Sequence, residues 1–118
     1  MTEELRDFTA RVIDSPLKLE LVAYFHRNRF TMDYAEGTAQ RVGADPEKVA
    51  KALRELAQVG VIHQHQSLYN ASRPPVFSYT RDSSICRLVD ELTRQLQTEE
   101  GRRAIWALIP SKESRDRC

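Results

Sequence analysis

Three basic side chains share one face of a predicted helix near the middle of the chain. Lys48, Lys51 and Arg54 recur every three residues, a spacing that makes side chains neighbours on a helix surface. Such a row can neutralise phosphates, and lysine or arginine can also donate two hydrogen bonds to guanine in the major groove of DNA. We therefore predict that Lys48 contacts a phosphate and that Lys51 or Arg54 contacts a guanine.

A second interpretation of the same face needs no ligand. Glu47 and Glu55 each lie four residues from Lys51, and opposite charges at that spacing attract one another on a helix. The face would then be an ordinary solvated surface. Glu47 could instead accept a hydrogen bond from cytosine N4, which would be compatible with DNA binding.

Two further arginines could extend a DNA contact. Arg41 precedes the turn before this helix and could reach a flanking phosphate. Arg73 lies at the tip of a predicted hairpin and could touch the DNA backbone or minor groove. The predicted DNA-binding set is Arg41, Glu47, Lys48, Lys51, Arg54 and Arg73.

Three other side chains have metal or redox chemistry available to them. His63 and His65 are two apart on a predicted strand and so point the same way, and with Cys86 they are weak candidates for zinc ligands. Cys86 also lies near a predicted helix N-terminus, where its thiol could become reactive. Alternatively, His63 and His65 are half-exposed polar residues of the wing, and Cys86 is a small packing residue. We expect no metal and no cofactor.

The helix that precedes the basic face carries start and stop signals. Asp33 and Glu36 have the spacing of a capping box, with Asp33 in the cap position of a helix over 34–42. Gly43 can adopt the left-handed conformation that ends a helix.

The basic helix itself is predicted over 46–59. Asp45 can cap it, and Pro46 suits its first position because that position needs no N–H donor. Gly60 closes it. Two short helices joined by a tight turn form a helix-turn-helix, whose second helix can enter the DNA major groove.

A β-hairpin is predicted directly after these helices. The run 76–80 has β-branched and aromatic residues in alternation, and the run 61–69 alternates weakly but has no competing helix signal. The loop 70–75 between them contains a stiff Pro-Pro step. A hairpin that follows a helix-turn-helix is the wing of a winged helix.

The rest of the chain is predicted to be helical. Apolar spacing gives helices over 2–13, from Pro16 to about Asn28, and over 83–109, where Thr98 marks a kink or a fresh start. The predicted fold is mainly α with a small β-hairpin wing. We expect one winged-helix domain over 1–110, with helices at 1–14 and 83–109, and a disordered tail over 111–118. Five aromatic residues could line the core or a ligand pocket: Tyr24, Phe25, Phe30, Phe77 and Tyr79.

Composition limits the possible functions. The chain has 118 residues, which favours a single domain, and two cysteines, which favour a reducing compartment without a disulfide scaffold. Its net charge of +1 gives no bulk electrostatic attraction to nucleic acid. No secretory signal and no membrane-length apolar run is present, so we expect a cytoplasmic protein with no membrane partner. No phosphate loop or nucleophile elbow supports catalysis, and we predict that the protein is not an enzyme.

The pattern over about residues 5–96 resembles the winged-helix transcription regulators of the ArsR-type or MarR-type superfamily. The similar segments are the helix from Pro16, the run Ala39–Gly43, and Val49, Leu53 and Leu56 followed by 60–62. The resemblance implies a dimeric regulator that binds duplex DNA, with helix 46–59 in the major groove. The alternative is a winged-helix protein-interaction module without DNA binding. An unknown small-molecule or thiol-reactive effector is compatible with the DNA-binding regulator.

The resemblance also implies that terminal helices pair across a two-fold axis. Helices 2–13 and 83–109 would supply that surface, and their apolar stripes are longer than one small core needs. The candidate dimer residues are Leu5, Phe8, Val12, Leu88, Leu92, Leu96, Ile105, Trp106 and Leu108. The chain departs from the metal-sensing members, because residues 37–42 contain no cysteine and the segment 89–94 contains no histidine.

Overall fold

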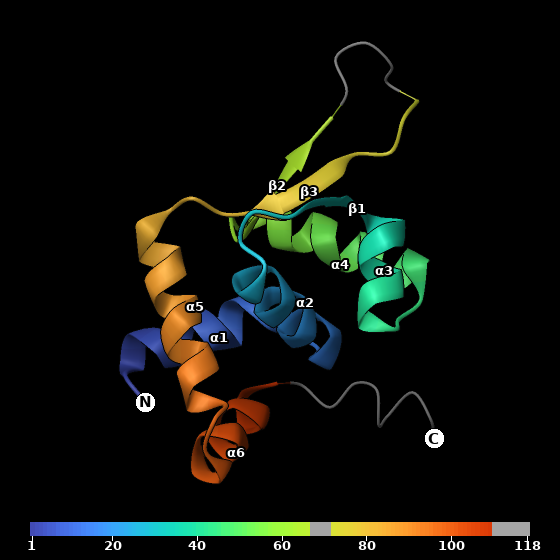
Figure 1. Cartoon of the computed structure of the whole chain (residues 1–118). Coiled ribbons are helices and arrows are strands. Elements are labelled where there is room, and N and C mark those ends of the chain that lie inside the picture. The colour runs from blue at the N-terminus through green and yellow to red at the C-terminus, as the bar shows by residue number, and fades with distance from the viewer. Residues whose placement is uncertain (67–71, 110–118) are drawn as a thin grey trace.

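The computed structural model describes residues 1–66 and 72–109, and it is a winged helix (Figure 1). The elements in chain order are α1 (Glu3–Val12), α2 (Pro16–Arg27), β1 (Met32–Tyr34), α3 (Ala35–Val42), α4 (Pro46–Gln58), β2 (Ile62–His65), β3 (Val76–Tyr79), α5 (Ser83–Gln95) and α6 (Glu99–Leu108). The prediction of a mainly helical fold with a small β wing is confirmed. The predicted tail 111–118 lies outside the described residues.

Side chains cap most of the helices. The side chains of Thr2, Ser15, Asp45, Asp82 and Thr98 each accept a backbone N–H from the first turn of the helix that follows. Thr98 therefore begins a separate helix, α6. Such caps satisfy donors that have no partner within the helix.

The predicted capping box at Asp33 is wrong. Asp33 lies in β1, opposite Phe77 of β3, and Tyr34 is the residue that precedes α3, without a side-chain cap. The Asp33 carboxylate instead accepts the Tyr34 N–H at 2.8 Å and lies 3.4 Å from the Arg41 guanidinium. Strand pairing keeps residues 32–34 extended, so the helix begins only at Ala35.

The three strands form one antiparallel sheet in the order β1-β3-β2. Ile62, Phe77 and Tyr79 point inward and are buried. Met32, Ser78 and His63 lie side by side on the other face, where Met32 is 60% exposed. The two faces of the sheet therefore differ: one packs on the helices, and the other is open to solvent.

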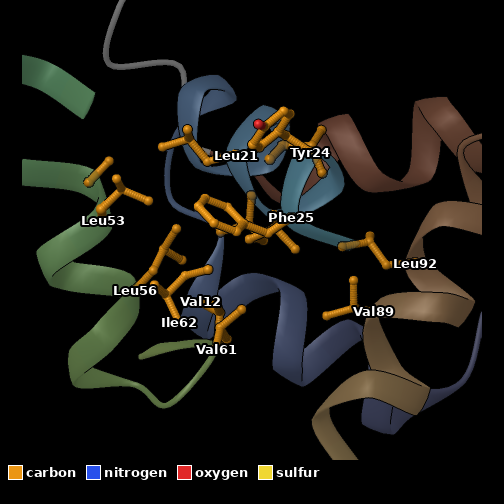
Figure 2. Packing of buried hydrophobic residues seen from close by; sticks show 14 of the residues in the cluster. Val12, Leu21, Tyr24, Phe25, Leu53, Leu56, Val61, Ile62, Val89 and Leu92 are labelled. Atoms are coloured by element: carbon orange, nitrogen blue, oxygen red, sulfur yellow. The ribbon is translucent and has the colours of Figure 1, made fainter. Parts of the chain in front are cut away.

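The core is centred on Phe25 of α2. Figure 2 shows its ring between Leu56 of α4 on one side and Val89 and Leu92 of α5 on the other; these side chains are all almost completely buried. Because burial of each such side chain stabilises the fold by about 1.5–3 kcal/mol, this cluster fixes α4 on the body of the domain. Phe25, Tyr24, Phe77 and Tyr79 belong to this core, whereas Phe30 is fully exposed.

Candidate nucleic-acid interface

The outer face of α4 is open to solvent. Lys48, Lys51 and Arg54 are exposed, while Val49, Leu53 and Leu56 on the opposite side are buried. Asp45 caps the helix by accepting the Lys48 N–H at 3.1 Å. The predicted basic row is therefore presented on a helix whose other side is firmly held.

The basic row is not neutralised within the described part of the chain. Lys48, Lys51 and Arg54 form no ion pair with any residue in 1–66 or 72–109. Glu55, one of the two candidate partners of Lys51, binds Lys18 of α2 at 2.9 Å instead. The face thus carries three cations that are available to an anionic ligand.

Lys18 helps to fix the position of α4. Its buried ammonium lies 2.9 Å from Glu55 of α4 and 3.0 Å from Asp14. Burial by itself lowers the pKa of Lys18, but hydrogen bonds to Glu55 and Asp14 outweigh it and raise the pKa above its ordinary value. Lys18 therefore stays charged and links α2 to α4.

Two adjoining hollows lie along α4. One of about 520 Å³ is lined by Asp45, Glu47, Lys48, Ala50, Lys51 and Arg54. The other, of about 490 Å³, lies between the start of α3, the helix α4 and three wing residues, Pro74, Pro75 and Phe77. Ala50 and Arg54 line both hollows. Among the predicted DNA contacts, Arg54 is therefore the one that borders both the outer face of α4 and the hollow on the side of the wing.

The two flanking arginines differ in their surroundings. Arg41 is 63% exposed and pairs with Asp33. Arg73 is exposed near the wing tip, and its backbone carbonyl accepts a hydrogen bond from the Gln66 side chain at 2.7 Å. Arg41 is thus tied to β1, whereas Arg73 lies on the projecting hairpin that Figure 1 shows above α4.

The turn between α3 and α4 follows the predicted chemistry. Gly43 has a φ of 71° in the left-handed region, which glycine adopts at little cost. The next amide, that of Ala44, donates to the carbonyl of Ala39 at 3.0 Å. Ala39 itself is 1% exposed, as expected of a small residue at a close helix contact.

The terminal helices lie at the end of the molecule away from the wing (Figure 1), where α6 packs against α1 and α5. Five of the predicted dimer residues fill the core of the single chain: Leu5, Phe8, Val12, Leu92 and Ile105. Leu88, Leu96 and Leu108 are partly exposed, and Trp106 is 46% exposed. The surface available for pairing is therefore smaller than the apolar stripes suggest.

His63, His65 and Cys86 lie around one hollow beside the sheet. The two imidazole rings stack with centroids 6.2 Å apart, and His65 Nε2 lies 2.8 Å from the Ser78 hydroxyl. Cys86 is half-buried against the core, with Sγ 3.7 Å from the Thr80 carbonyl. Among the described residues, no group of three or more His, Cys, Asp and Glu side chains is arranged to hold a metal ion.

Sequence reasoning missed a polar junction between α2, β3 and α5. His26 Nδ1 lies 3.2 Å from the Tyr79 hydroxyl, and Nε2 lies 3.4 Å from Asp90. Burial and the nearby Arg29 lower the pKa of His26, while burial raises the pKa of Tyr79 far above its ordinary value. The one signal in the sequence for this junction is a histidine that directly follows the aromatic residues Tyr24 and Phe25.

The chain shares its fold with known regulators, although no family model and no curated protein matches its sequence. A possible transcriptional regulator from Methanosarcina mazei superposes with a TM-score of 0.58 and 10% identity, over 86% of this chain and 83% of that one. A MepR mutant from a multidrug-resistant clinical isolate of S. aureus gives 0.57 and 15%, over 94% and 77%. Another S. aureus MepR mutant, bound to an oligodeoxyribonucleotide, gives 0.55 and 9%, over 96% and 81%.

These likenesses establish a winged helix of the kind found in transcription regulators. At 9–15% identity they show the fold alone and do not distinguish an ArsR-type from a MarR-type protein. Within the described residues, no helix has the length and apolar character required to cross a membrane.

Proposed function

We propose that the protein is a transcription regulator that binds duplex DNA sequence-specifically as a homodimer. Helix α4 enters the major groove, and the wing lies beside it. The observation that carries this proposal is the row of three exposed, unpaired cations on α4, next to the projecting wing. The MepR neighbour solved with an oligodeoxyribonucleotide supports the same use of the fold.

Each residue of the interface has a proposed role. Lys48 binds a phosphate, and Lys51 or Arg54 reaches a guanine edge. Glu47, exposed on the same face, accepts from a cytosine amino group. Arg73 approaches the DNA backbone or the minor groove from the wing, and Arg41 adds a phosphate contact if its pairing with Asp33 opens.

The proposed dimer forms through the partly exposed residues of the terminal helices, Leu88, Leu96, Trp106 and Leu108. A two-fold axis between these helices would place the two α4 helices in successive major grooves. The half-sites of the operator would then be about 34 Å apart.

A protein-interaction module is the second candidate, because the first turn of α4 is acidic at Asp45 and Glu47. Negative charge there opposes phosphate. The Asp45 carboxylate, however, has a structural role as the cap of α4, so its presence does not argue specifically for a protein partner.

Selection of bound sequences from random duplex DNA tests the proposal, followed by affinity measurement on the selected site. The variant Arg54→Ala should weaken binding by about 1–3 kcal/mol and relax the preference at one base pair. Arg6→Ala removes an exposed arginine from α1, away from the wing, and should leave binding unchanged. Failure to enrich any sequence would favour the interaction module, and equal affinities of Arg54→Ala and wild type would remove Arg54 from the interface.

A further inference from the structure

A third hollow, the one around which His63, His65 and Cys86 lie, is on the open face of the wing sheet. Its volume is about 790 Å³, within the range of small-molecule sites. The linker from α2 to β1, the open face of the sheet and the connection from β3 to α5 form its walls, and Figure 1 shows these two connections meeting beside the sheet. None of the proposed DNA contacts lines it.

The charges around this hollow have one sign. Arg29 and Arg81 line it, together with His63 and His65, and no aspartate or glutamate does. Neither arginine forms an ion pair with a residue that the structure describes. In a chain that has 18 basic and 17 acidic residues, such a one-sided lining favours an anionic occupant.

The nearest acidic side chains are already engaged elsewhere. Asp82, which follows Arg81, accepts the amides of Ser84 and Ile85 at 2.8 and 3.2 Å as the cap of α5. Asp90 pairs with Arg94 and with His26. Within the described residues, neither carboxylate forms an ion pair with Arg29 or Arg81.

Arg29 is held in place at the wall. Its guanidinium donates to the His26 carbonyl at 3.3 Å and lies 3.3 Å from His26 Nε2. Both partners are uncharged, because the carbonyl is neutral and burial lowers the pKa of His26. The guanidinium is thus oriented without being neutralised, and its remaining donors are free for a ligand.

The same hollow also offers apolar surface that no residue in 1–66 or 72–109 covers. Phe30 is 100% exposed and Met32 is 60% exposed, and both line it. Exposed apolar side chains that adjoin one another in a hollow, unlike single scattered ones, are typical of a ligand or partner site. The occupant therefore needs an apolar body as well as a negative group.

We propose that this hollow binds a small organic anion with an aromatic or aliphatic body. The anionic group lies between Arg29 and Arg81, and the apolar body covers Phe30 and Met32. This binding does not depend on the proposed DNA function, so each can be tested without the other.

The test uses 8-anilinonaphthalene-1-sulfonate as the probe, with its uncharged analogue N-phenyl-1-naphthylamine as the matched ligand control. The full chain is titrated by fluorescence, and the site is located from backbone amide shifts in two-dimensional NMR. The double variant Arg29→Gln/Arg81→Gln should weaken sulfonate binding roughly tenfold or more. Arg6→Gln makes the same type of substitution at one exposed arginine of α1 and should leave binding unchanged. Shifts should concentrate in residues 29–32, 63–65 and 78–81.

Phe30→Ala tests the apolar half of the site. Its side chain is fully exposed, so the variant should keep the fold, and it should weaken binding of the probe about threefold or more. The proposal is overturned if the arginine double variant and Arg6→Gln bind the sulfonate equally, if the uncharged amine binds as tightly as the sulfonate, or if the shifts lie elsewhere.

Discussion

At the scale of single residues, Asp45 has two opposing effects. Its carboxylate caps α4 through the Lys48 amide, which stabilises the helix, and the same negative charge lies where α4 would approach phosphate. The capping side chain is needed for folding, whereas its charge is not, because asparagine caps a helix about as well as aspartate.

Two substitutions separate these effects. Asp45→Ala should lower the free energy of unfolding by about 1 kcal/mol, and Asp45→Asn by a few tenths. Both should strengthen binding to duplex DNA at low salt, by roughly two- to fivefold. Urea unfolding and fluorescence anisotropy measure the two quantities, and weaker DNA binding by Asp45→Asn would contradict the proposed orientation of α4.

The residue scale also shows what the sequence could predict about the site. The exposure of Lys48, Lys51 and Arg54 follows from helical spacing against Val49, Leu53 and Leu56, and the structure agrees with it. The partner of Glu55 could not be predicted, because Lys18 lies 37 positions away in sequence and only tertiary packing brings it to α4.

At the scale of elements, the junction of α2, β3 and α5 depends on a histidine that is held neutral. Burial and Arg29 lower the pKa of His26 in the folded protein. As the pH falls below about 6.5, the ordinary value, the unfolded chain therefore takes up a proton that the folded chain does not. By linkage, the folded state loses stability over that range.

The variant His26→Gln cannot take up this proton. We expect the stability advantage of wild type over His26→Gln to be smaller at pH 5.5 than at pH 8, because the loss on acidification belongs to wild type alone. Urea unfolding of both proteins at the two pH values measures it. An advantage that stays constant or grows in acid would contradict the assignment.

The elements differ in how well the sequence predicts them. Asp45 caps a helix where its chemistry predicts, because a cap is a local interaction. Asp33 has the same local chemistry, but strand pairing with Phe77 takes it into β1. The open hollow around Phe30 also escaped prediction, since aromatic residues are normally buried.

At the scale of the whole molecule, the proposed dimer depends on a small apolar surface. The terminal helices bury Leu5, Leu92 and Ile105 within one chain and leave Trp106 46% exposed on α6. Sequence periodicity cannot separate these two outcomes, because a core position and an interface position have the same apolar spacing.

Trp106 is therefore the residue to change. Trp106→Glu should shift the sedimenting species from twice 13.6 kDa toward 13.6 kDa, since a charge at a dimer interface typically costs several kcal/mol. Gln58→Glu, at an exposed position at the end of α4 and away from the terminal helices, is the control because it also adds one negative charge to the surface. A wild-type chain that sediments as a monomer at all concentrations would contradict the dimer.

The central claim is that the cations of α4 meet a polyanion. The salt dependence of duplex binding tests it most directly, by anisotropy between about 50 and 200 mM salt, because each neutralised phosphate contributes about −0.9 to the slope of log K against log salt. We predict steep loss of affinity for wild type. For Lys48→Ala/Lys51→Ala/Arg54→Ala we predict weaker binding at every salt concentration and a slope that is shallower by at least about one per subunit, because Lys48 is the proposed phosphate contact. No duplex binding at low salt, or equal slopes for the two proteins, would contradict the account.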